Sequence, residues 1–271
     1  MRILGFSQIR DMLVRLAPSR LSKEAARALK PDTDEDTVVK SLTDTEEAVV
    51  CLEREGQIPL GGITDIRPFL EKAKREVTLS ADECIAVWEN AQRYGQIQDF
   101  FASKGEDYPQ LSQRAETLGD FSLLVQRVGA VFDENHQVRD NASVELARLR
   151  TRIAELERRT KRYIQQILAD KSYQKYFQDT LVTVRNNRSV IPVKQEYRHA
   201  FPGIVHDMSA SGATLYVEPL AVVDANNDLQ TAKLAEEKEI ERIYRRLTAL
   251  IAGQYEELYK SKMTTGELEF A

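Results

Sequence analysis

The chain has 271 residues and a mass of 30.9 kDa, which is room for one large domain or two small ones. Its 42% of hydrophobic residues excludes wholesale disorder, and scarce glycine (12 residues) and proline (8) exclude a many-turned all-β protein and favour long helices. A net charge of −5 excludes nucleic-acid binding driven by the average charge of the whole chain.

The first 132 residues predict a series of amphipathic helices. Ser80 and Glu83 form a capping box, and the acidic residues 34–36 suit the positive end of a helix dipole. Apolar spacing, caps, prolines and glycines together indicate helical segments over 6–17, 19–30, 34–55, 80–104, 111–118 and 121–131. Residues 1–132 are therefore predicted to form a compact helical core domain.

A long helix is predicted over residues 143–170, about 42 Å at 1.5 Å per residue. Its apolar stripe alternates by three and four residues, as in a heptad repeat. The stripe comprises Leu146, Leu149, Ile153, Leu156, Thr160, Tyr163 and Ile167. The outer faces carry Arg148, Arg150, Arg152, Arg158, Arg159, Lys161 and Arg162, for which a solvated face is the simplest interpretation.

The apolar period then changes from that of a helix to that of strands. The runs 180–184 and 189–193 flank Asn186 and Asn187, which favours a hairpin because asparagine tolerates the positive φ of a tight turn. Pro192 predicts an edge strand or a bulge. Two further strands are predicted at 203–207 and 213–218, which gives four short antiparallel strands over about 180–218.

A second long helix is predicted from Pro219, as its first residue, to about Lys262, or about 66 Å. The predicted fold class is mainly α: a helical core bundle plus two long antiparallel helices that carry a small antiparallel sheet. Residues 133–271 are predicted as this second domain, an arm with the sheet at its tip and the 1–132 bundle at its base.

Charge divides unevenly along the chain. Residues 139–198 hold 14 lysines and arginines and 7 acidic residues, and are therefore basic. The remainder of the chain holds 24 lysines and arginines and 36 acidic residues, and is therefore acidic. A basic element on an acidic protein is typical of contact with a polyanion. The alternative is internal ion pairing with the acidic second helix at Glu236, Glu237, Glu239 and Glu241.

Catalytic and cofactor motifs are not found. The sequence has no P-loop motif, no metal-ligand spacing among His136, His199 and His206, and only two cysteines, Cys51 and Cys84. Ser209 and Ser211 read as turn residues rather than nucleophiles. We therefore expect no catalytic residue, cofactor or metal in these residues. The cysteine usage predicts a reducing cytoplasm, and no apolar run is long enough to span a membrane.

Three segments resemble the bacterial MutS type II family. They are RNNRSVIPVKQEYRHAFPGIVHDMSASGATLYVEPLAVVDANNDL at 185–229, LTDTEEAVVCLEREGQIPLGGITDIRPFL at 42–70 and FDENHQVRDNASVELARLR at 132–150. The resemblance implies a MutS-like core domain, lever helices and a clamp, in a homodimer. It also implies an ATPase domain that uses ATP and Mg and, in many members, a C-terminal Smr nuclease domain.

The sequence departs from the family pattern in one respect: it ends at Ala271, where the family would return to its core and enter the ATPase domain. ATP hydrolysis and nicking are therefore assigned to no residue here. The roles that the resemblance implies are suppression of homologous recombination through branched DNA and splitting of stalled, collided ribosomes. Both partners, DNA and ribosomal RNA, are polyanions.

Two hypotheses follow for these residues. In the first, the clamp embraces branched or duplex DNA or ribosomal RNA without reading its sequence, and Arg185, Arg188, Lys194 and Arg198 meet phosphates. In the second, the long helices form a scaffold that self-associates or transmits ATPase-driven motion without direct nucleic-acid contact. Pairing of 143–170 with 219–262 inside one chain would occupy the heptad stripe and leave none for a partner.

Overall fold

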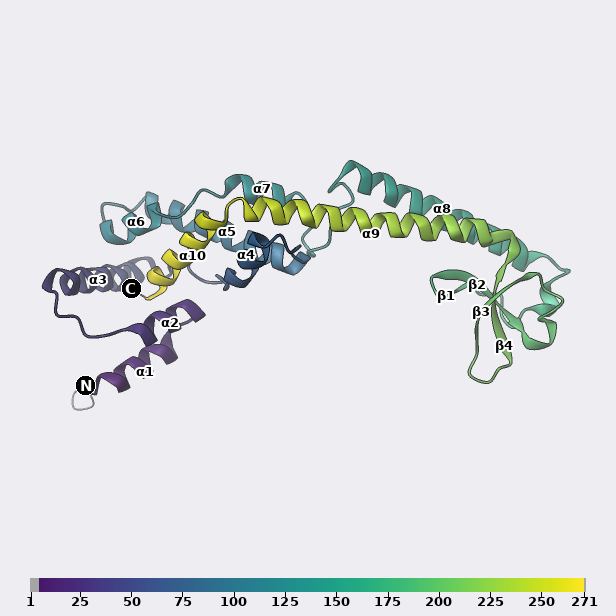
Figure 1. The fold of residues 1–271 in the computed structure, drawn as a ribbon, viewed down its shortest axis with the longest axis horizontal. Coiled ribbons are helices and arrows are strands. Elements are labelled where there is room, and N and C mark those ends of the chain that lie inside the picture. The colour runs from purple at the N-terminus through teal and green to yellow at the C-terminus, as the bar shows by residue number, and fades with distance from the viewer. Residues whose placement is uncertain (1–4, 271) are drawn as a thin grey trace. The chain divides into compact units, whose positions relative to one another are not determined.

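A computed structural model describes residues 5–270 and confirms a mainly α protein with one small antiparallel sheet (Figure 1). The α-helices of the described residues are α1 (Phe6–Leu16), α2 (Arg20–Ala28), α3 (Glu35–Glu55), α4 (Arg67–Lys74), α5 (Ala81–Ala102), α6 (Pro109–Glu116), α7 (Ser122–Gly129), α8 (Val144–Ala169), α9 (Val223–Ala252) and α10 (Tyr255–Phe270). The strands are β1 (Thr183–Arg185), β2 (Arg188–Lys194), β3 (Gly203–Met208) and β4 (Thr214–Pro219).

The chain divides into two compact units. Of the residues that the structure describes, the first unit contains 5–139 and 243–270, and the second contains 140–242. This division differs from the predicted domains 1–132 and 133–271, because the end of α9 and all of α10 belong to the first unit. Leu79 donates its backbone N–H to Thr248 (2.9 Å) and Gly119 donates its own to Ser261 (2.9 Å), so long-range hydrogen bonds hold this segment there.

Two helix starts in the first unit lie where the sequence predicts them, at the acidic residues 34–36 and at the capping box of Ser80 and Glu83. Asp34 accepts the Thr37 backbone N–H (3.0 Å), and Ser80 and Glu83 exchange both hydrogen bonds of a capping box. Helix α4, with Pro68 in its first turn, was not predicted. The core between these helices contains fully buried side chains of α4, α5, α6 and α7, among them Leu70, Tyr94, Ile97, Leu111 and Leu124.

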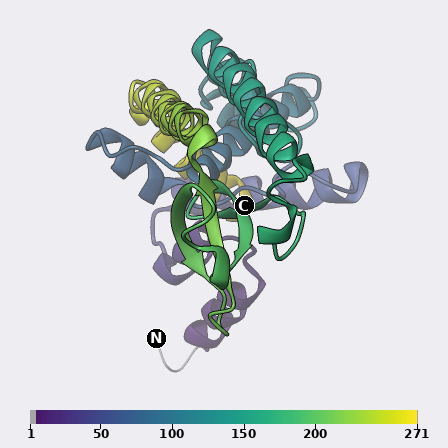
Figure 2. The same ribbon diagram turned by 90° about the vertical axis from the view of Figure 1, so that its right-hand side faces the viewer.

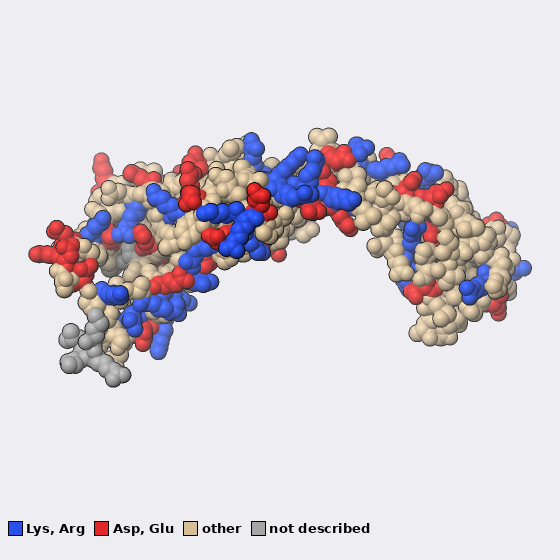
Figure 3. Space-filling view, viewed as in Figure 1, with Lys and Arg blue, Asp and Glu red and all other residues tan. Residues whose placement is uncertain are grey.

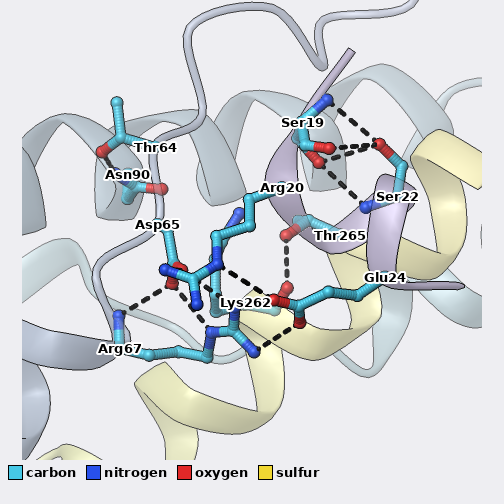
Figure 4. A network of polar contacts seen from close by, with 10 residues as sticks. All are labelled: Ser19, Arg20, Ser22, Glu24, Thr64, Asp65, Arg67, Asn90, Lys262 and Thr265. Carbon is cyan, nitrogen blue, oxygen red and sulfur yellow. Dashed lines mark hydrogen bonds and ion pairs between the residues drawn. The ribbon is translucent and has the colours of Figure 1, made fainter. Parts of the chain in front are cut away.

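A charged network ties α2, α4 and the segment before α4 together in the first unit (Figure 4). The Arg67 guanidinium donates to both carboxylate oxygens of Asp65 (2.8 Å each) and of Glu24 (3.0 and 3.2 Å). These bonds hold the pKa of Asp65 and of Glu24 below their usual values of 3.8 and 4.5, although burial opposes this. Buried Lys262 of α10 lies beside the network, and its desolvation lowers its pKa.

Acid is expected to weaken this network. Because the carboxyl pKa values are lowered on folding, their stabilisation is complete above about pH 4.5 and is lost as the pH falls through the lowered values. Arg67→Met should cost about 2 kcal/mol at neutral pH and reduce the loss on acidification. Urea unfolding at neutral and acidic pH, followed by the fluorescence of Trp88 in this unit, measures the stability cost and its change with pH. If the stability of the variant depends on pH as strongly as that of the unchanged chain, the prediction is wrong.

Helices α8 and α9 run side by side and antiparallel in the second unit (Figure 1). Hydrogen bonds and ion pairs join Ser143 to Glu239 (2.7 Å), Arg150 to Glu236 (2.8 Å) and Glu157 to Lys233 (2.8 Å). Ile153 and Leu156 pack on Leu229 and Ala232. The predicted pairing inside one chain is therefore observed for this part of the two helices.

The buried stripe of α8 differs from the predicted one at its end. Tyr163 is 37% exposed, whereas Ile164 and Leu168 are buried in the core beneath the sheet. A straight helix of 3.6 residues per turn drifts away from a strict heptad, so after two heptads the inward face moves by one residue. The predicted inward position Tyr163 is therefore corrected to Ile164, whereas Ile167 is partly buried and packs against the same core as buried Leu168.

The four strands form one sheet in the order β1-β2-β4-β3, in which all neighbours are antiparallel. Figure 2 shows the molecule with this sheet toward the viewer. Asn186 and Asn187 have φ of 49° and 60°, which confirms the predicted tight turn between β1 and β2. β2 is an inner strand, contrary to the edge predicted from Pro192. Strand β1 pairs with β2 only from Arg188 to Val190, so Pro192 has no partner in β1, and its lack of an N–H costs no bond to that strand. The Pro192 carbonyl accepts the Gln178 backbone N–H (2.9 Å).

The predicted helix over 219–262 is wrong at both ends. Pro219 lies in β4, with φ −62° and ψ 140°, and a 3₁₀ turn over Leu220–Val222 precedes α9. Gly253 and Gln254 then separate α9 from α10. Pro219 pairs with Gly203 of β3, so sheet formation overrides its suitability for the first turn of a helix. Within residues 5–270, no helix is both apolar and long enough to cross a bilayer.

Candidate nucleic-acid interface

The four predicted cations all lie in the second unit, on the sheet or on the loop that leaves it. Arg185 ends β1 and Arg188 starts β2, on either side of the asparagine turn. Lys194 ends β2, and Arg198 follows a 3₁₀ turn over Gln195–Tyr197. The hairpin therefore places two of them at its turn and the other two at the opposite end of β2.

Arg188 is held inside the protein. Its guanidinium donates to Glu218 of β4 (3.0 Å), whose side chain is only 1% exposed. The same carboxylate contacts His206 of β3 (2.6 Å) and accepts from Asn226 of α9 (2.7 Å). Burial disfavours the ionised form, yet the three hydrogen bonds outweigh it and lower the pKa of Glu218. We call these four residues the Glu218 network.

Arg185 is partly occupied. Its side chain pairs with Asp207 of β3 (3.3 Å), donates to Thr183 (3.1 Å), and lies over the ring of Tyr216 with 4.2 Å between the guanidinium carbon and the ring centroid. It remains 37% exposed. A stacked guanidinium of this kind is held in place but can still present donors to a ligand.

Lys194 and Arg198 are the more open pair. The Lys194 ammonium donates to the Lys175 backbone carbonyl (3.3 Å), and exposed Arg198 has no ion pair or side-chain hydrogen bond with residues 5–270. The Lys175 ammonium lies 5.2 Å from the ring centroid of Tyr176, whose ring is 4.9 Å from that of Tyr197. These five residues, with lysines and arginine beside half-buried tyrosines, form what we call the Lys–Tyr cluster.

The sequence prediction did not single out Lys175, Tyr176 or Tyr197. The signal was present as alternating basic and aromatic residues in the run YQKYF at 173–177, within the basic stretch 139–198. Glu196 lies beside the cluster, and its negative charge raises the pKa of Tyr197. On the face shown in Figure 3, the sheet region is mostly uncharged, with a few separate basic and acidic groups.

The residues weighed as catalytic or metal-binding have structural contacts. Ser209 accepts the Thr214 backbone N–H (3.1 Å) within the turn between β3 and β4, and Asp207 pairs with Arg185. His206 contacts Glu218. Among the described residues, no group of three or more acidic, histidine or cysteine side chains is arranged to hold a metal ion.

Comparison with known proteins found several relatives that match the whole chain. It is 38% identical over 273 residues to an endonuclease MutS2 of Geobacillus sp. (strain WCH70), and the aligned region covers 100% of this chain and 35% of the relative. It is 40% identical over 270 residues to a putative endonuclease MutS2 of Bacillus subtilis (strain 168), and this aligned region covers 98% of the chain and 34% of the relative. An endonuclease MutS2 of Symbiobacterium thermophilum is 37% identical over 271 residues. No family model matches the chain. The chain spans about a third of the length of the curated relatives it matches.

Proposed function

Because this chain belongs to the MutS2 family, we propose that it is a part of a MutS2 protein that binds nucleic acid without reading its sequence. The observation that carries the proposal is the Lys–Tyr cluster, where cations open to solvent lie beside aromatic rings. Cations attract phosphates, and aromatic rings offer stacking surfaces that accept any base. Arg185 is the third cation of the predicted set that we assign to phosphate contact.

Arg188 takes a different part in the proposal. Because its guanidinium faces buried Glu218, we assign it to holding the sheet rather than to contact with phosphate. If the Arg188 guanidinium left this pair, the buried Glu218 carboxylate would lose its arginine partner and keep only the bonds to His206 and Asn226, which is costly. The binding set that we propose is therefore Arg185, Lys194 and Arg198 of the predicted residues, with Lys175 added.

We propose partners that share a phosphate backbone. Branched or duplex DNA fits a role in suppression of homologous recombination, and ribosomal RNA fits a role in splitting collided ribosomes. The relatives are named endonucleases, and we propose that nicking, ATP hydrolysis with Mg, and a homodimer are properties of the longer MutS2 protein. We assign none of these activities to particular residues of this chain.

The scaffold hypothesis retains support in one form. The packing of α8 on α9 makes a paired helical element that is suited to transmit motion between its ends. The same packing occupies Ile153 and Leu156, so we do not propose self-association through the heptad stripe of α8. Transmission and nucleic-acid contact are compatible in one protein.

The triple variant Lys175→Gln, Lys194→Gln, Arg198→Gln is expected to bind duplex DNA more weakly than the unchanged chain. Each lost phosphate contact should reduce the slope of log affinity against log salt by about 0.9. The measurement is fluorescence anisotropy of a labelled duplex between about 50 and 200 mM salt. Arg15→Gln, Arg27→Gln, Lys40→Gln, three exposed positions of the first unit, is the charge-matched control. Equal affinity and slope in the two variants would remove the cluster from the interface.

A further inference from the structure

Four arginines of α8 share the helix face that points away from α9. They are Arg148, Arg152, Arg159 and Arg162, which we call the α8 arginine stripe. Spacings of four, seven and three residues place them within an arc of about 80° on a helix of 3.6 residues per turn. All four are exposed, whereas the buried positions of α8 lie on the opposite side. The stripe is about 21 Å long.

Arginines of this one helix fall into two classes by their partners. Arg150, on the inner side, donates to Glu236 of α9 (2.8 Å) and to Asp140 (2.5 Å). Arg152 and Arg162 have no ion pair or hydrogen bond from their side chains to any described residue. Arg148 reaches only Glu145 one turn away, and Arg159 reaches only Tyr163 (3.3 Å). Internal pairing with α9 therefore explains Arg150 but not the stripe.

Little negative charge opposes the stripe. Glu155 lies within its arc and Glu145 lies at its edge. Besides the hydrogen bond to Tyr163, Asp228 of α9 is near enough to Arg159 for its negative charge to contribute to that arginine's raised pKa. The stripe with neighbouring Arg158 carries five arginines against these three carboxylates. Glu157 faces the other way and pairs with Lys233. Two open hollows, of 580 and 560 Å³, adjoin the stripe; one is lined by Glu155, Arg158 and Arg162, and the other includes Arg148 and Arg152.

The chemistry of this face selects among anionic partners. A helix that lies on a membrane needs a row of bulky apolar side chains next to its cations. On this face of α8 the bulky side chains are Val144 and Tyr163 at its two ends, and the residues between the arginines are small or charged: Thr151, Ala154 and Glu155. Arginine forks match phosphate oxygens and form two parallel hydrogen bonds. Duplex DNA presents one phosphate charge per about 1.7 Å of its axis, so a stripe of this length faces several phosphates at once.

We propose that the α8 arginine stripe is a second phosphate-binding surface, which lies along the backbone of duplex DNA independently of the Lys–Tyr cluster. It rests on the proposed function, since both surfaces would bind the same duplex. Because α8 is packed on α9, it meets a duplex from outside, through the phosphates and not through a groove. The choice of partner therefore follows the axial phosphate spacing of duplex DNA. We commit the stripe to duplex DNA, with duplex RNA as a competing outcome.

The test is the variant Arg148→Gln, Arg152→Gln, Arg159→Gln, Arg162→Gln in the 271-residue chain. Anisotropy of a labelled duplex is recorded between about 50 and 200 mM salt, with duplex DNA and duplex RNA of equal length. The slope of log affinity against log salt is expected to fall by about 0.9 for each lost contact, and so by up to about 3.6. The fourfold arginine-to-lysine variant should keep most of the slope, because lysine still binds phosphate as a point charge.

Matched controls separate the two proposals. The control variant Arg15→Gln, Arg27→Gln, Lys40→Gln, Arg75→Gln removes the same charge from exposed positions of the first unit and should leave the slope unchanged. If the stripe variant equals this control while the unchanged chain binds DNA, the stripe proposal fails and the proposed function stands. If the unchanged chain binds no duplex, the proposed function fails with it. A larger loss on duplex RNA than on DNA would overturn the choice of DNA.

Discussion

Replacing Glu218 by alanine is expected to destabilise the sheet of the second unit by about 3–5 kcal/mol. The carboxylate is 1% exposed and joins Arg188 of β2, His206 of β3 and Asn226 of α9. Its removal leaves a half-buried guanidinium without its charge partner and opens a gap between two strands and a helix. Removing one member of a buried pair costs far more than the pair contributes, because the remaining charge stays desolvated.

Hydrogen exchange of the strand amides measures this loss where it occurs. A change of about 3 kcal/mol corresponds to an exchange rate about 100-fold faster for amides that exchange through opening of the sheet. Fluorescence of Trp88, the single tryptophan, reports the first unit and should change little. Glu237→Ala, an exposed position of α9, is the control and should stay within about 0.5 kcal/mol. Unchanged exchange in the Glu218 variant would refute the structural assignment of Arg188.

Gly203→Ala is expected to cost about 3 kcal/mol through overpacking at the start of β3. A β-carbon there would lie 2.4 Å from a methyl carbon of Val217 and 2.6 Å from the Glu218 backbone oxygen. Neither neighbour can move freely, because Val217 is a β-branched residue of the buried core and the oxygen belongs to β4, which pairs with β3. Strand β3 must therefore shift away from β4.

The same exchange measurement tests the glycine, with Gly61→Ala as its control. A β-carbon at Gly61 would meet no atom within 4 Å, so this substitution should stay within about 0.5 kcal/mol. Faster exchange confined to β3 and β4 is the expected pattern. If Gly203→Ala leaves the strand amides as protected as in the unchanged chain, the close approach of the two strands is not as described.

These two variants also bear on nucleic-acid binding. A variant of Arg188 that weakens binding could act by loosening the sheet, whereas variants of Lys194 or Arg198 remove exposed charges and leave the Glu218 network intact. A true phosphate contact lowers the salt slope without faster exchange of the strand amides. A loosened sheet gives faster exchange in the absence of any nucleic acid.

The sequence by itself determined the local features of this protein. The helix start at the acidic residues 34–36, the capping box of Ser80 and Glu83, and the tight turn at Asn186 and Asn187 were predicted and confirmed. Each depends on atoms a few residues apart, so the short stretch that contains the signal also contains the partner. The mainly α composition and the existence of a small antiparallel sheet follow from the same local periodicities.

Tertiary structure decided how those elements are used. Pro219 looks like a helix start, but pairing with Gly203 keeps it in β4. The last turns of α8 pack beneath the sheet, where Ile164 and Leu168 join side chains of β2 and β4 in one core that the helix sequence alone does not identify.

The division among the predicted cations was also a tertiary decision. Arg188 and Arg198 are alike in sequence, yet one lies against a buried carboxylate 30 residues away and the other faces solvent. A guanidinium reaches whichever carboxylate the fold brings within about 3 Å of it. Local spacing cannot specify that partner, because strand pairing sets the distance between the two.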